Sequence, residues 1–219
     1  MALNLADGKR AERKLLITVA EWESSEGTIY EVLTQKPSDW DTSYTNYYTR
    51  SGTSPDYTYE AVTGSTAPTF AESTYYKRIA REILGKRVED SSIEFNADTT
   101  KATDILGITY TDVNKTEPQQ SFDPFNVIGG SKLASYLVDA ALSNDISKYN
   151  NVFNVYVITA FIGNSSAYST VKHTGCSIIP TSLGGDAWVK LPIEVHYSNN
   201  ITKGTVNKLA DDFEFTAAA

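Results

Sequence analysis

The chain has 219 residues and a formal net charge of −8. This acidic balance argues against tight binding to nucleic acid, because proteins that grip phosphates carry clustered lysine and arginine. The single cysteine excludes an internal disulfide and a cysteine-based metal site. Residues 1–13 lack a signal-peptide core, and no apolar run reaches membrane-spanning length, so we expect cytoplasmic synthesis.

The chain opens with two strand patterns. Residues 15–19 and 28–33 are short β-branched or leucine-rich runs, and Ser24-Ser25-Glu26-Gly27 lies between them. Small and polar residues around a glycine are typical of a turn. We expect a β-hairpin here.

A segment rich in tyrosine, serine and threonine follows at about residues 35–72. It has no clear periodicity and contains several prolines, which predicts a long loop inserted between strands. Disordered tracts are poor in aromatic residues, and tyrosine supplies contact area at low entropic cost. We expect the loop to become ordered against a neighbouring subunit; the alternative is an irregular excursion that packs on its own domain. The residues predicted to make the inter-subunit or inter-ring contact are Trp40, Tyr44, Tyr47, Tyr48, Tyr57 and Tyr59.

Two segments space their apolar residues as a helix does. Residues 73–84 precede Gly85, a candidate C-cap. Residues 131–144 begin at Ser131, a candidate N-cap that follows Gly129-Gly130. Each segment is expected to pack one face on a sheet. In the second helix, the predicted packing residues against the outer face of the sheet are Leu133, Leu137 and Ala141.

Strand patterns dominate the remainder. Residues 93–98, 108–111 and 189–198 alternate apolar and polar side chains, which is typical of strands with one buried and one wet face. Residues 152–162 are more continuously apolar, which indicates a strand covered on both faces. The pattern predicts a mainly β fold with one or two flanking helices, in a single domain over residues 1–219.

No motif for catalysis or metal binding stands out. His173 and Cys176 have opposite parity on a strand, so they are expected on opposite faces. Glu94 and Asp98 are expected on one strand face at about 13 Å, wider than the glycosidase carboxylate separations of about 5–9.5 Å. Gly129-Gly130-Ser131-Lys132 lacks the spacing of a phosphate loop and favours a turn with a helix cap. We therefore expect no enzyme, no catalytic or metal-binding residue and no cofactor.

Several blocks of sequence carry a family resemblance. They are DILGITYTDVNKTEPQQSFDPF at 104–125, GSKL at 130–133, KHTGCSIIPTSLGG at 172–185, LPIEVHYSNNITKGTV at 191–206 and DDFEF at 211–215. In this order, over residues 92–216, they resemble the major tail-tube proteins of long-tailed, siphovirus-type bacteriophages of Gram-positive hosts and related prophages. The first third of the chain has no counterpart in the resemblance.

The resemblance implies a β-sandwich or half-barrel protomer with a flanking helix. Such protomers assemble into rings, usually hexameric, whose inner sheets close into one β-barrel, and the rings stack into a tube. The implied partners are further copies of the chain, tail-tip and tail-terminator proteins, and the tape-measure protein and DNA, which pass through the lumen by weak contact only. No membrane partner is expected, and the implied location is the virion tail, after synthesis in the cytoplasm of the host bacterium.

One polar strand face would line such a lumen. The candidates are Glu94, Asn96, Asp98 and Glu194, which alternate with apolar residues that are expected to be buried. An acidic wall repels DNA and so resists sticking to it. The alternative is that this face points outward to solvent.

Two other functions fit parts of the sequence. The first is a carbohydrate- or surface-binding β-sandwich module that uses Trp40 and the tyrosines Tyr47, Tyr48, Tyr57 and Tyr59 as a stacking platform. The second is a hydrolase that uses Glu94, Asp98 or Glu194.

Overall fold

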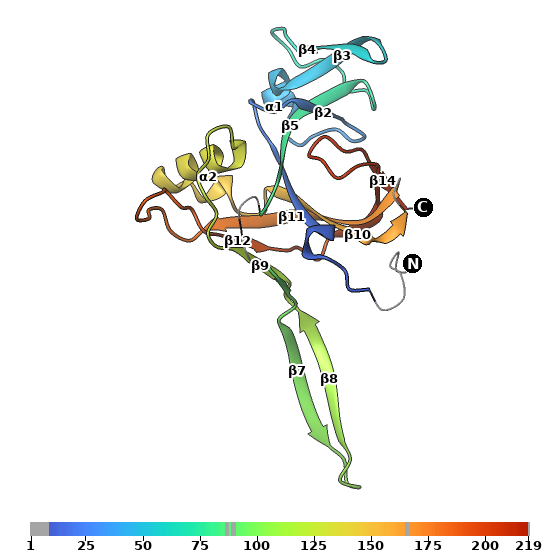
Figure 1. Cartoon of the computed structure of the whole chain (residues 1–219). Coiled ribbons are helices and arrows are strands. Elements are labelled where there is room, and N and C mark those ends of the chain that lie inside the picture. The colour runs from blue at the N-terminus through green and yellow to red at the C-terminus, as the bar shows by residue number, and fades with distance from the viewer. Residues whose placement is uncertain (1–8, 86–87, 89–90, 165–166, 219) are drawn as a thin grey trace. The chain divides into compact units, whose positions relative to one another are not determined.

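The computed structural model describes residues 9–85, 88, 91–164 and 167–218 (Figure 1). Within these residues, twelve strands form one large antiparallel sheet, two further strands form a separate small sheet, and two short α-helices are present. The predicted mainly β class is confirmed. The chain divides into two compact units, residues 21–81 and residues 1–20 with 82–219. Strands β1 (Leu16–Glu23) and β5 (Tyr75–Ile83) run across the division.

The unit at residues 21–81 has a core of its own. Its other elements are β2 (Ile29–Val32), α1 (Trp40–Ser43), a 3₁₀ turn (Tyr44–Asn46), β3 (Tyr47–Thr53) and β4 (Asp56–Ala61). The buried side chains of Leu33, Trp40, Tyr47, Val62 and Tyr75 pack together. The expectation of an irregular loop at 35–72 is therefore wrong, because the segment folds as a helical turn and a β-hairpin around Trp40.

The strands that open the chain do not form the expected hairpin with each other. Strand β2 pairs with β5, in a register that places Ile29 opposite Ile79 and Val32 opposite Tyr76. Strand β1 lies between β5 and β10 in the order of the sheet. Both strands are therefore neighbours of a third strand, β5, and not of each other.

Residues 75–83 form strand β5, so the helix predicted at 73–84 is wrong. Its buried side chains come as adjacent pairs, Tyr75 with Tyr76 and Ile79 with Ala80. Neighbouring residues on a strand point to opposite faces, so these pairs show a strand covered on both sides. Apolar residues at positions 76, 79, 80 and 83 fit such a strand as well as they fit a helical stripe. Tyrosine and isoleucine also favour strands.

The other unit contains most of the sheet. Its strands are β6 (Ile93–Glu94), β7 (Ala97–Thr103), β8 (Thr109–Thr116), β9 (Gln119–Phe122), β10 (Phe153–Asn164), β11 (Ala167–Pro180), β12 (Ile193–His196), β13 (Ile201–Val206) and β14 (Phe215–Ala217). Its helix is α2 (Lys132–Leu142), with 3₁₀ turns at Arg13–Leu15 and Ile146–Lys148. A core cluster joins strands distant in sequence, with Val19, Tyr156, Ile158, Val206 and Phe213 all buried.

Strand β11 changes partner along one of its edges. Residues 168–173 pair with β13, and residues 177–180 pair with β12. Gly175 lies between the two ladders with φ of +78°, a conformation that glycine adopts without steric cost. The glycine therefore lets one long strand serve two neighbours.

Helix α2 forms where the spacing predicted a helix. The Ser131 hydroxyl accepts a hydrogen bond from the Ala134 amide at 3.0 Å, as expected of an N-cap. Glu82, the penultimate residue of β5, also caps this end, because its carboxylate accepts bonds from the Ser131 hydroxyl at 2.7 Å and the Leu133 amide at 3.1 Å. A negative charge near the first turn is favoured by the helix dipole.

Candidate functional site

Strands β7 and β8 form a two-stranded ribbon that is exposed along its whole length. Their antiparallel register runs from Ala97 opposite Thr116 to Thr103 opposite Thr109. Every residue of both strands is exposed. Figure 1 shows the ribbon leaving the large sheet beside β9. An isolated two-stranded hairpin is marginally stable in water at best, so this ribbon is an unusual way to end a sheet.

The ribbon carries large apolar side chains in solvent. They are Ile105, Leu106, Ile108, Tyr110 and Val113. The two at the tip are the most exposed, with Ile105 at 102% and Leu106 at 77% of full accessibility. Single exposed apolar residues are ordinary, but several together mark an interaction site.

The tip of the ribbon is ordered by one carboxylate. Asp104 accepts hydrogen bonds from the amides of Leu106 at 2.8 Å and Ile108 at 2.9 Å, and from the Tyr110 hydroxyl at 2.9 Å. The bond from the Ile108 amide, with those from Tyr110 and Leu106, lowers the pKa of Asp104. Gly107, with φ of +78°, completes the turn. The tip therefore presents Ile105 and Leu106 in a defined conformation.

The base of the ribbon begins at a break in the strand. Asn96 has φ of +42°, and its side chain donates a hydrogen bond to the Glu117 carbonyl at 3.1 Å. The Glu117 amide in turn donates to the Phe95 carbonyl at 3.0 Å. The single alternating strand predicted over residues 93–98 is therefore wrong, because the backbone turns at Asn96 and divides it into β6 and β7. Phe95 and Ala97, expected to be buried, are exposed.

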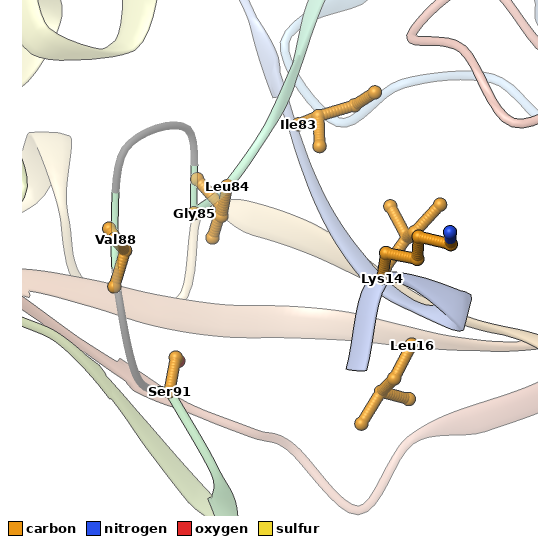
Figure 2. Close-up of a pocket in the computed structure, with 8 residues that line it drawn as sticks. Lys14, Leu16, Ile83, Leu84, Gly85, Val88 and Ser91 are labelled. Carbon is orange, nitrogen blue, oxygen red and sulfur yellow. The ribbon is translucent and has the colours of Figure 1, made fainter. Parts of the chain in front are cut away.

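A cavity of about 300 Å³ lies in the same unit as the ribbon. Leu16, Ile17, Ile83, Leu84 and Val88 line it with aliphatic side chains, and Lys14, Gly85 and Ser91 complete it. Figure 2 shows Lys14 and Leu16 on one side of the cavity and Val88 and Ser91 on the other. Two further cavities, in residues 21–81, have mostly polar linings, in which Glu23 is shared and the cations are Arg78 in one and Lys36 and Lys77 in the other.

The structure brings together two of the four candidate lumen residues. Glu94 pairs with Gln119, and Glu194 pairs with Ser121 two residues further along the same strand, β9. Directly paired residues lie on one face of a sheet, so both glutamates share a face. The opposite face carries the row of Ile93, Gln120 and Val195.

The other two candidates lie elsewhere. Asn96 is at the base of the ribbon and Asp98 is on β7, so neither continues the row of Glu94. The expectation that Glu94 and Asp98 share one strand face is therefore wrong. Which face of the sheet would line a lumen stays a prediction.

The residues predicted to pack helix α2 take different positions. Leu133 and Leu137 are fully buried, and the helix contacts β11. Ala141 is half-buried, and Ala140 is the buried alanine at the end of the stripe.

The aromatic residues of the predicted loop divide into two groups. Trp40 and Tyr47 are core residues; the Trp40 indole donates a hydrogen bond to the Pro68 carbonyl at 2.8 Å, and the Tyr47 hydroxyl donates one to Asp39 at 2.6 Å. Burial and that bond raise the pKa of Tyr47. Tyr44 packs at the edge of this core. A stacking platform that needs Trp40 and Tyr47 is therefore not available on the surface.

Tyr48, Tyr57 and Tyr59 form an outer aromatic group with Tyr30 and Tyr76. The Tyr30 and Tyr59 rings stack at 3.9 Å between centroids, and both the Tyr48 and the Tyr76 rings meet this stack edge-on. Arg50 lies over the Tyr57 ring at 4.2 Å. These rings therefore contact one another within residues 21–81, and their predicted contact with a neighbouring subunit stays a prediction.

His173 and Cys176 do not form a nucleophile–base pair. The Cys176 thiol is buried and faces the His173 backbone carbonyl at 3.6 Å, while the His173 ring nitrogen Nδ1 is 2.9 Å from the Ser198 carbonyl. Burial raises the pKa of the Cys176 thiol and lowers that of His173. Both changes favour the neutral forms, so this cysteine is a core residue.

The apolar tip is the feature that sequence reasoning missed. Ile105 and Leu106 sit between Asp104 and Gly107, where turns normally carry polar residues. A hairpin tip has no core of its own in which to bury apolar side chains. Two adjacent aliphatic residues inside such a turn were therefore a signal, available in the sequence, of a contact surface.

No protein-family model matches the chain, and no curated protein matches it. Among the described residues, no helix is long and apolar enough to cross a membrane. The same residues contain no cluster of three or more histidine, cysteine, aspartate or glutamate side chains that would hold a metal ion.

Proposed function

We propose that this chain is a structural subunit of a bacteriophage tail tube, which polymerises as stacked, hexameric rings and forms the conduit for genome delivery. The protomer in this proposal is a tail-tube-type half-barrel, its role is mechanical, and its location is the virion tail. Its partners are further copies of the chain, tail-tip and tail-terminator proteins, and a tape-measure protein and DNA held by weak contact in the lumen.

The exposed ribbon is the observation that carries the proposal. A ribbon without a hydrophobic face against its own sheet gains burial only from another molecule, and five large apolar side chains favour such a contact. A subunit repeated in a polymer offers the same partner surface at every position. The sequence resemblance over residues 92–216 supports the same reading.

The acidic balance and the shared face of Glu94 and Glu194 are consistent with a lumen. In a ring, each glutamate would be repeated by symmetry and would form a circle of negative charge. Like charges along the path of DNA reduce adhesion to the wall.

Assembly of the purified protein tests the proposal. We expect negative-stain micrographs at high concentration to show rings or tubes with a central channel, with or without a tail-tip complex as nucleus. Sedimentation velocity that finds only monomer across the same concentrations, with the nucleus present, would rule the proposal out.

A further inference from the structure

We propose that the tip formed by Ile105 and Leu106 in one copy inserts into the aliphatic cavity beside Leu16 and Ile83 of a second copy. This inference rests on the proposed function, because it assigns a contact within the polymer. The occupant of the cavity is thus the ribbon tip of a second copy of the chain. The contact joins two different surfaces of identical molecules.

The tip has the properties of a preorganised anchor. Its two aliphatic side chains stand in solvent, while Asp104 holds the turn through bonds to the Leu106 and Ile108 amides. A segment already held in its bound conformation loses little conformational entropy on binding. Only a small loss of conformational entropy then opposes the burial of the two aliphatic side chains.

The cavity matches the tip in chemistry and size. Of the three cavities described above, this one has the largest share of aliphatic residues in its lining, five of eight. Its volume of about 300 Å³ is at the lower end of the range for small-ligand sites, about 300–1,000 Å³, which suits a pair of aliphatic side chains. Lys14 lines it beside the aliphatic residues and is exposed, and its ion pair with Glu12 is a surface pair. Such pairs contribute little, so Lys14 is available to the acidic Asp104 next to the tip.

The tip cannot reach the cavity of its own chain. Ser91, which lines the cavity, lies two residues before β6 and therefore near the base of the ribbon. The seven residues of β7 extend away from that base by roughly 23 Å at the rise of a strand. A return would break the ladder from Ala97–Thr116 to Thr103–Thr109. The contact must therefore be made with another copy.

A contact between two different surfaces propagates. Each copy offers one tip and one cavity, so every added copy exposes another of each, and the association closes into a ring or continues as a filament. This is the behaviour that a tube subunit needs.

Disulfide trapping between two variants, each with one introduced cysteine, tests the contact directly. One preparation carries Leu106→Cys and the other Leu16→Cys, and the buried native Cys176 stays in both. Under mild oxidation with oxidised glutathione, we expect a crosslinked dimer in the mixture and not in either preparation alone. A mixture of Leu106→Cys with Ile146→Cys, an exposed residue off the ribbon, is the control and should stay uncrosslinked.

A second measurement uses a tip variant that leaves the fold intact. Leu106→Ser removes one anchor from an exposed position, and we expect it to raise the concentration needed for assembly by about tenfold or more, since burial of a leucine side chain corresponds to at least that factor. Ile146→Ser, which also removes an exposed aliphatic side chain, should leave that concentration unchanged.

The outcomes separate this contact from the proposed function. Tubes that form normally with Leu106→Ser and give no crosslink overturn the contact and leave the tail tube standing. Crosslinked head-to-tail oligomers without a central channel support the contact and count against the tail tube. Equal crosslinking of the Ile146→Cys control, or no association at all, overturns the contact.

Discussion

The Tyr197 hydroxyl donates a hydrogen bond to the side-chain oxygen of Gln120 at 2.6 Å in the interior of the sheet. The same oxygen accepts the Thr18 hydroxyl at 3.0 Å, and the Gln120 amide donates to the Ser91 hydroxyl at 3.1 Å. Gln120 has no exposed surface. Its polar atoms are thus satisfied by partners from β1, from the segment before β6 and from the residue that follows β12, so one side chain joins three distant parts of the chain.

Gln120→Leu should destabilise the protein because it removes the acceptor of two buried hydroxyl groups. We expect a loss of about 1–3 kcal/mol in the free energy of unfolding, measured by urea denaturation. Gln119→Leu changes the adjacent, half-buried residue on the other face of β9 and should have a much smaller effect. Equal losses for both variants would show that the buried network adds nothing.

Leu137→Asp should prevent the docking of helix α2. Leu137 is fully buried, and an unpaired charge at such a position costs several kcal/mol. The expected result is insoluble protein, measured as the soluble fraction after expression. Leu142→Asp, on the same helix at 73% exposure, should remain soluble. A soluble, assembling Leu137→Asp variant would place the helix elsewhere.

The order of the ribbon tip should depend on pH through Asp104. Its pKa is lowered in the folded chain by the bonds it accepts, first of all from the Ile108 amide, so these bonds favour the ionised form. Their contribution is complete above the ordinary carboxyl pKa and is lost as pH falls through the lower, folded value. We expect the protection of the Leu106 and Ile108 amides against hydrogen exchange, measured relative to an unstructured peptide at the same pH, to fall in acid. In Asp104→Asn this protection should be low at neutral pH as well, and strong protection in that variant would contradict this role.

Charge reversal on the shared glutamate face tests the lumen. Glu94→Lys combined with Glu194→Lys should leave tubes intact but let DNA adhere, most strongly at low salt, where screening is weakest. The measurement is retention of a short duplex by assembled tubes across a salt series. Asp56→Lys with Glu60→Lys makes the same change in net charge on exposed positions of β4 and should retain less DNA. Equal DNA retention by the two double variants would show that Glu94 and Glu194 do not line the lumen.

Trp40→Ala should unfold the unit at residues 21–81. The indole is fully buried and packs against Tyr47, Phe70 and Tyr75, and loss of a buried tryptophan costs about 3–5 kcal/mol. Tyr57→Ala, at a position 39% exposed, should cost far less. Thermal unfolding followed by near-ultraviolet circular dichroism distinguishes the two. A native signal in Trp40→Ala would mean that this core is dispensable.

Sequence patterns correctly predicted the elements whose apolar residues follow one period and whose surroundings differ clearly between the two faces. Residues 191–197 alternate buried and half-buried side chains as predicted, because one face of β12 is covered and the other is not. Helix α2 combined an apolar stripe with an N-cap, so two independent signals agreed.

The failures have local and long-range causes. Residues 75–83 form a strand that is covered on both faces. Its apolar residues therefore occur at positions that also fit one face of a helix. Strands β3 and β4 are short and largely exposed, so no alternation marks them, and their core depends on Leu33 and Tyr75 from outside the segment. The break at Asn96 depends on one positive φ angle, which residue types in the alternating run do not reveal.

The place of β1 between β5 and β10 affects how the chain folds during synthesis. Strand β1, at residues 16–23, can pair with β5 once about 60 further residues have been made. Its other edge stays unpaired until residues 153–164, which form β10, have been made. At translation rates of about 5–20 residues per second, that second edge stays open for on the order of ten seconds. The β7–β8 ribbon needs only neighbouring residues and closes in microseconds once it is made. Each new copy therefore exposes the apolar residues of the ribbon while the sheet beside it is still incomplete, and this exposure makes association between unfinished chains a hazard of synthesis.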